Sequence, residues 1–146
     1  MMRLSAFALI LVSALPAMAE PLATRKGMDG FITVDRLPVP DDPALAQGRI
    51  LWGETCQNCH GGDRLTGAPK ITSTKAWDKR IAQGMAVLTD HAINGFIGPR
   101  YTEMPARGGN SELSDAQVGL AVAFMVWASG GQALAEDFIK TLDTKD

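Results

Sequence analysis

Two cysteines and a histidine form the strongest chemical pattern in the chain, Cys56-Gln57-Asn58-Cys59-His60. The spacing C-x-x-C-H is the attachment sequence of a c-type haem. Two thiols three residues apart lie on one side of a helical turn, from which both can form thioethers with the vinyl groups of one porphyrin. His60 can then turn its imidazole toward the iron as an axial ligand. The pattern predicts one covalently attached haem.

The same two cysteines could also act without haem. In an oxidising compartment, Cys56 and Cys59 could form a disulfide. A redox dithiol of the thioredoxin kind needs a β-α-β context, which the sequence lacks. Zinc would need four ligands from two cysteines and two histidines, and His60 stands awkwardly beside Cys59. The adjacent histidine therefore favours haem.

A second axial ligand has to come from a distant part of the chain. A methionine opposite the histidine raises the redox potential and closes the iron to substrates. Met104 is the candidate, because rigid Pro105 and two glycines follow it in a loop that can press against the porphyrin. His91 is the alternative and would give bis-histidine ligation. The other methionines after the leader are Met28, Met85 and Met125, of which the last two suit helix faces in the core.

Three further residues could complete a haem pocket. A ligating histidine usually donates its other ring N–H to a carbonyl, which orients the ring and raises its basicity. The Pro69 carbonyl is the expected acceptor for His60, because proline stiffens the loop that presents it. Trp77 and Arg80 share a helical face by i, i+3 spacing and are candidate donors to the haem propionates, with Trp77 preferred.

The first nineteen residues have the form of an export signal. Arg3 precedes an apolar run over residues 4–15, and Ala17 and Ala19 mark a cleavage site. The run is too short to span a bilayer comfortably. We expect cleavage after Ala19 and a periplasmic protein, with an uncleaved anchor as the alternative. The residue directly after the cleavage site is Glu20 and not cysteine, so no lipid anchor is expected there.

The charge balance argues against nucleic acid as a partner. The chain has 14 Lys and Arg against 16 Asp and Glu, and loss of Arg3 with the leader leaves 13 against 16, a formal net charge of −3. Two haem propionates would make the molecule more acidic. Such a protein is not drawn to nucleic acid or to an anionic membrane. We expect no stable membrane insertion after signal cleavage.

Two helices have clear end signals. Asp42 is a natural N-cap and Pro43 fits the first helical position, so a helix should start there and run directly into the haem motif. Ser114 and Gln117 form a capping box for a later helix, which should end at Gly130.

One glycine predicts how these two helices pack. Gly48 lies inside the first helix, where glycine costs about 1 kcal/mol relative to alanine. That cost makes sense if the later helix crosses at close range, with Ala121 and Phe124 on the crossing face.

The remaining segments flank a single domain at residues 42–130. Residues 20–41 should form an irregular arm on the domain surface, and residues 131–146 a C-terminal extension with a short helix. Within the domain we expect short helices over 74–84 and 85–93, and loops over 61–73 and 94–113.

The ordered motifs resemble the class I c-type cytochromes, closest to the small soluble bacterial cytochrome c-five group. The resemblance covers about residues 42–130. It rests on Cys56-Gln57-Asn58-Cys59-His60, Gly67-Ala68-Pro69-Lys70, Trp77 and Arg80 with Gly84, Met104-Pro105 with Arg107-Gly108-Gly109, and the capped helix with Phe124-Met125.

The resemblance implies an all-α class I cytochrome c fold. Its N- and C-terminal helices cross at Gly48, Trp52 and Phe124, short helices and loops surround one haem, and His60 and Met104 ligate the iron. Three features depart from the family. The extra cysteine pair of some members is missing, residues 96–103 make a long approach to the methionine, and both ends of the chain fall outside the match.

A closed, six-coordinate haem implies an electron-transfer protein rather than an enzyme. We expect a periplasmic one-electron carrier that meets a dehydrogenase, an oxidase or another cytochrome through small, transient interfaces. The alternative is a haem protein with a displaceable sixth ligand that acts on peroxide, gases or sulfur compounds. That chemistry would need a distal acid–base group, for which His91 is the available histidine.

Overall fold

Six α-helices make up most of the residues that the computed structural model describes, which are 28–62, 66–99 and 102–143. The expected leader at 1–19 and the first part of the arm lie outside these residues. The helices are α1 Pro43–Leu51, α2 Gln57–His60, α3 Thr74–Ile81, α4 Met85–Asn94, α5 Asp115–Ala128 and α6 Gln132–Asp143. The predicted all-α class is confirmed.

Both predicted helix starts are present. The Asp42 carboxylate accepts hydrogen bonds from the backbone N–H groups of Ala44 and Leu45, at 2.8 and 3.0 Å. Ser114 and Gln117 form a reciprocal capping box at the start of α5. These bonds satisfy N–H groups that a helix cannot pair internally, so the local sequence sets where α1 and α5 begin.

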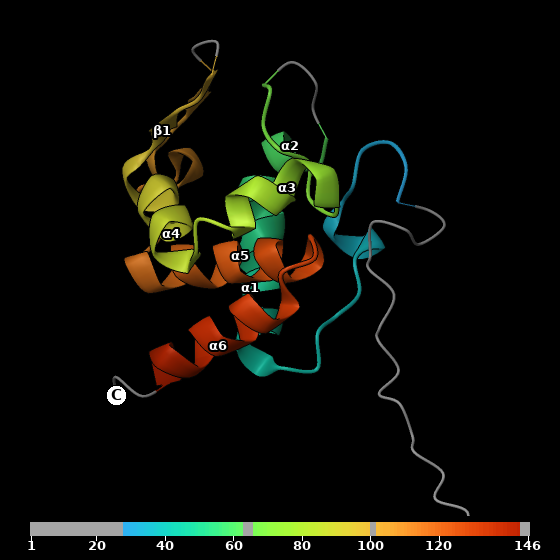
Figure 1. Ribbon diagram of the computed structural model, residues 1–146, viewed down its shortest axis with the longest axis vertical. Coiled ribbons are helices and arrows are strands. Elements are labelled where there is room, and N and C mark those ends of the chain that lie inside the picture. Colours follow the sequence, from blue (N-terminus) through green and yellow to red (C-terminus); the bar gives the residue numbers. More distant parts are fainter. Residues whose placement is uncertain (1–27, 63–65, 100–101, 144–146) are drawn as a thin grey trace, which may run out of the picture.

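The predicted crossing of α1 and α5 is confirmed at Gly48 (Figure 1). A Cβ atom on Gly48 would lie 2.2 Å from the Leu120 carbonyl oxygen. Beyond this point the rings of Trp52 and Phe124, both fully buried, pack with centroids 6.2 Å apart. The crossing fixes the C-terminal end of α1, which leads through one further helical turn to the haem motif.

The first helix does not run into the motif as a regular α-helix. After α1 the chain forms the π-helical turn η3, Trp52–Cys56, and α2 follows directly. In a π-helical turn the hydrogen bonds join residues five apart instead of the four of an α-helix, and such turns are frequent at functional sites. Its position makes Cys56 the residue where the helix geometry changes.

The expected loop over residues 94–113 contains regular structure. Strands β1, Phe96–Ile97, and β2, Glu103–Met104, pair antiparallel with Phe96 opposite Met104. A 3₁₀ turn, η5, follows at Ala106–Gly109. Strands of two residues have no alternation that a sequence pattern could reveal. The described part of this segment therefore has more regular structure than predicted.

The arm is not confined to the surface, contrary to expectation. Ile32 and Leu37 are 0% and 3% exposed, and a short 3₁₀ turn, η2, spans Val34–Arg36 between them. Two large apolar side chains in an irregular segment can anchor it to the core without a helix of its own. Figure 1 places this arm, in blue, on the opposite side of the α1/α5 crossing from α4 and β1.

The segment after Gly131 forms α6, which lies along α5 (Figure 1). Its Ala135 and Ile139 are buried, and the Phe138 ring contacts Gly119 of α5. Within the described residues, no helix combines the length and the apolar character needed to cross a membrane.

Candidate haem attachment site

The haem motif lies at the junction of η3 and α2. Cys59 is exposed, Cys56 is half-buried, and neither sulfur forms a disulfide. Burial raises the pKa of the Cys56 thiol to about 11, and the neighbouring Cys59 adds to the shift.

His60 is oriented by a single well-defined hydrogen bond. Its side chain is buried, and Nδ1 lies 2.9 Å from the Pro69 carbonyl oxygen. A carbonyl can only accept, so Nδ1 carries the proton and Nε2 keeps its lone pair. This is the arrangement that a metal-ligating histidine usually has. It also matches the pairing of His60 with Pro69 that the sequence predicts.

The surroundings of His60 favour its neutral form. Burial lowers its pKa, the hydrogen bond to Pro69 partly offsets this, and the positive charge of Arg80 lowers it further. A histidine must be neutral to bind a metal. Two thiols and a neutral imidazole with an available Nε2 are the donor set that haem c requires, so the residues fit the group.

Trp77 and Arg80 lie beside His60, but Trp77 cannot serve as predicted. The Trp77 ring is 6.5 Å from the His60 ring, and its Nε1–H donates to the Lys70 carbonyl at 2.9 Å. Indole has one N–H, so no donor remains for a propionate. Arg80 donates to the Ala76 carbonyl and has further N–H groups, and its propionate role stays a prediction.

Met104 lies on the second strand of the small ladder. Its side chain is half-buried and packs against the hydrophobic core. The turn that follows it contacts the motif helix: Asn110 Nδ2 donates to Thr55 Oγ1 at 3.4 Å, and a Cβ on Gly108 would lie 3.0 Å from Thr55 Cγ2. Thr55 directly precedes Cys56, so the methionine loop and the attachment turn are in direct contact.

The turn after Met104 depends on Arg107. This residue adopts a left-handed conformation with φ 54°, which is uncommon outside glycine. Its guanidinium donates to the Leu113 carbonyl at 2.8 Å and pairs with Asp115 at 2.6 Å. These contacts connect the loop to the first turn of α5.

His91, the alternative ligand, contacts the same hairpin. Its ring stacks on Phe96 with centroids 4.3 Å apart and an interplanar angle of 29°. Phe96 lies opposite Met104 in the ladder. His91 thus supports the strand pair from α4.

Comparisons with known proteins agree with the site. The family described as cytochrome C oxidase, cbb3-type, subunit III matches residues 43–125, more than half of the chain. Cytochrome c-555 of Chlorobaculum tepidum is 46% identical over 84 residues, which cover 58% of this chain and 76% of the relative. The chain belongs to the class I c-type cytochromes. Its cofactor is therefore covalent haem c, and Cys56 and Cys59 have the spacing for its attachment.

Two further relatives have the same name. Cytochrome c-555 of Prosthecochloris aestuarii is 40% identical over 85 residues, covering 56% of this chain and 85% of the relative. That of Chlorobaculum thiosulfatiphilum is 44% identical over 84 residues, covering 58% and 95%. The family match includes α1 to most of α5 and excludes the arm and α6.

Sequence reasoning missed three residues that shape the site. Gln57 accepts a hydrogen bond from the arm, and Lys70 donates one to the arm. Thr55 accepts a hydrogen bond from the loop that follows Met104. Their partners lie 23, 42 and 55 positions away in the chain. No local periodicity reports such pairings.

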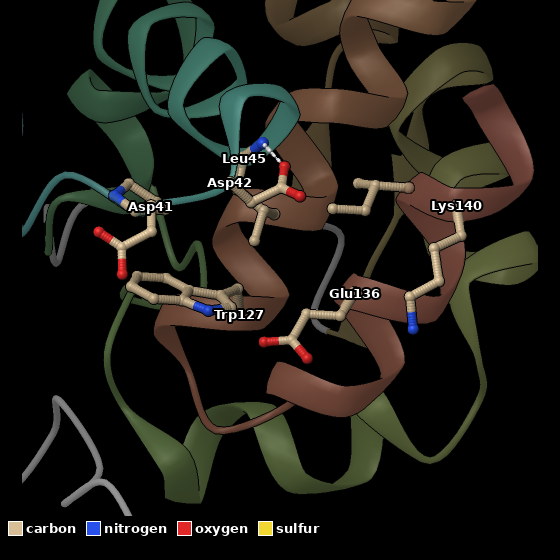
Figure 2. Close-up of a pocket in the computed structure, with 8 residues that line it drawn as sticks. Asp41, Asp42, Leu45, Trp127, Glu136 and Lys140 are labelled. Atoms are coloured by element: carbon tan, nitrogen blue, oxygen red, sulfur yellow. Dashed lines mark hydrogen bonds between the residues drawn. The ribbon is translucent and has the colours of Figure 1, made fainter.

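A hollow of about 360 Å³ lies away from the predicted site residues, none of which lines it (Figure 2). It is bounded by the start of α1 with Asp41 and Asp42, by Trp127 near the end of α5, and by Glu136 and Lys140 of α6. The hollow therefore lies between α5 on one side and, on the other, α6 and the residues just before and at the start of α1.

Proposed function

We propose that this protein is a periplasmic one-electron carrier whose haem c is attached through Cys56 and Cys59 and ligated by His60 and Met104. The group supplies a metal centre that changes its oxidation state by one electron. The chain holds that centre in place, limits access to it and presents a surface for redox partners. Membership in the c-type cytochromes and the names of the relatives support an electron carrier.

The observation that carries the proposal is the hydrogen bond from His60 Nδ1 to the Pro69 carbonyl, at 2.9 Å. It fixes the neutral tautomer with Nε2 available, on a residue that directly follows the second cysteine.

The surroundings of the other methionines support Met104 as the sixth ligand. The sulfur of Met125 accepts a hydrogen bond from the buried Trp52 N–H at 3.1 Å. Met85 is 5% exposed and belongs to the core. Met104 is half-buried on a strand whose following turn contacts Thr55. Of these three methionines, Met104 is the one with a partly exposed side chain.

Replacing Met104 by alanine tests the assignment. The variant should keep its covalent haem, lose the methionine-to-iron charge-transfer band and have a lower reduction potential, since axial ligands set potentials over a range of about 0.8 V. Met85→Leu is the control and should keep the band. A band that survives in Met104→Ala would contradict the assignment.

Carbon monoxide distinguishes a carrier from a haem that binds substrates. The native ferrous protein should resist carbon monoxide near neutral pH, while Met104→Ala should bind it readily because the sixth position is then open. Rapid, complete binding by the native protein would contradict the proposal of a closed carrier. Partners would be other redox proteins that dock transiently.

A further inference from the structure

The arm at residues 28–37 contacts the haem motif although it lies outside the family match at 43–125. The Ile32 N–H donates to the Gly61 carbonyl at 2.7 Å, and the Val34 N–H donates to Gln57 Oε1 at 2.5 Å. Gln57 stands between the two cysteines, and Gly61 directly follows His60. The arm is therefore bonded to residues on both sides of His60.

Two glycines near the motif make room for the arm. A Cβ on Gly53 would lie 2.9 Å from Val34 Cβ, and one on Gly61 would lie 2.6 Å from the Ile32 carbonyl oxygen. Gly61 has φ −69°, a helical value open to any residue. Close approach of the arm accounts for glycine at position 53 and contributes to it at position 61, where a Cβ would also lie 2.7 Å from the Gln57 carbonyl oxygen.

The same arm also holds the segment that carries the hydrogen-bond acceptor of His60. Lys70 Nζ donates to the Met28 carbonyl at 2.9 Å, and the Lys70 carbonyl accepts from Trp77 Nε1 at 2.9 Å. Lys70 directly follows Pro69, whose carbonyl accepts from His60. The acceptor is thus held from the arm on one side and from α3 on the other.

We propose that residues 28–37 act as a positioning strap for His60. The strap holds the turn that carries the imidazole and the loop that carries the Pro69 carbonyl in one unit. It thereby keeps the bond between them short and shields the Nδ1 proton from water. Because this bond raises the basicity of a ligating histidine, the strap also lowers the reduction potential of the centre. The inference rests on His60 as an axial ligand and is independent of Met104.

Two substitutions release the strap at different ends. Gln57→Leu removes the acceptor of the Val34 N–H, and Lys70→Met removes the donor to the Met28 carbonyl. Each should accelerate exchange of the His60 Nδ1 proton with D₂O about fivefold, as expected for loss of one hydrogen bond. Gln57→Leu should also raise the reduction potential, and Lys70→Met should raise it relative to a control variant that loses one surface lysine. NMR of the ferrous holoprotein and a redox titration measure both effects.

Matched controls separate the loss of a bond to the strap from the general effect of replacing glutamine by leucine or lysine by methionine. Gln47→Leu and Lys75→Met make the same replacements at exposed positions of α1 and α3. Lys75→Met also corrects for the loss of one positive charge, which alone would lower the potential. Both controls should leave exchange at His60 unchanged.

The outcomes distinguish failure of the strap from failure of the proposed function. Exchange rates in Gln57→Leu and Lys70→Met that match their controls would overturn the strap, even if the potential moves. Spectra in which His60 lacks the signature of an iron-bound imidazole would instead refute His60 as a ligand. Loss of the Met104 assignment alone would leave the strap standing, because its readout is at His60.

Discussion

His60 and Met104, the two proposed axial ligands, lie in regions that are held in different ways. His60 is 6% exposed, and Pro69 and Trp77 surround it together with the arm. Met104 lies on a ladder of two residues per strand, whose other strand has Phe96 and Ile97 at 39% and 61% exposure. The His60 side is thus part of the core, whereas the Met104 side packs against the core and is partly exposed.

This difference in burial indicates which contacts can be lost without unfolding the protein. Substitution on the His60 side removes buried contacts, each of which contributes to global stability. Substitution on the Met104 side removes exposed contacts, which contribute little to global stability but hold a loop. The two sides should therefore respond in different observables, the first in unfolding free energy and the second in access of foreign ligands.

Trp77→Ala should have the largest effect and tests the His60 side. Trp77 is 3% exposed and fills space beside the His60 ring. Truncating a buried aromatic residue costs about 3–5 kcal/mol, whereas Trp77→Phe keeps most of the packing and should cost about 1 kcal/mol for the lost bond to Lys70. Denaturant unfolding of the holoprotein measures both. A cost below about 1 kcal/mol for the alanine variant would contradict a core role.

The parts of the fold that the sequence predicts are those with local or steric signals. The caps at Asp42 and Ser114 are visible within a few residues. Gly48 is visible because glycine inside a helix needs a reason, and the reason is the Leu120 backbone. The C-x-x-C-H spacing is equally local. These signals suffice to place the haem motif at the end of a helix held by a crossing.

The parts that could not be predicted depend on contacts between distant segments. The Trp77 N–H could be assigned to a propionate because nothing local reveals that the Lys70 carbonyl takes it. The arm gives no periodic pattern, because Ile32 and Leu37 are anchored by an irregular backbone. The sequence shows the position of the arm only indirectly, through Gly53 and Gly61 near the motif. The arm atoms that leave no room for a side chain there are known only from the structure.

Arg107→Gln tests the Met104 side. It should lower the free energy of unfolding less than Trp77→Ala does, and it should increase the access of added ligands to the iron more. The variant loses the partly exposed ion pair with Asp115 and the bond to Leu113, together about 1 kcal/mol. The loop after Met104 then loosens, and the ferric protein should bind added imidazole more tightly, as an optical titration would measure.

Asp115→Asn is the matched variant for this loop. It removes the charge pairing and leaves the bond from Arg107 to the Leu113 carbonyl in place. Its imidazole affinity should fall between those of the native protein and Arg107→Gln. Equal affinities in all three proteins would mean that the turn does not restrain Met104, and the contrast between the two sides would lose its basis.

His91→Ala should have the smallest effect. The stack on Phe96 supports the strand that pairs with the Met104 strand, and an aromatic pair at a partly exposed site contributes about 0.5 kcal/mol. The charge-transfer band should remain, with a slight gain in imidazole affinity that His91→Phe restores because phenylalanine can keep the stack. Loss of the band in His91→Ala together with its persistence in Met104→Ala would instead make His91 the ligand. The sixth ligand would then come from α4, whose Leu88 and Ala92 are buried, and the loosely held hairpin would no longer control access to the iron.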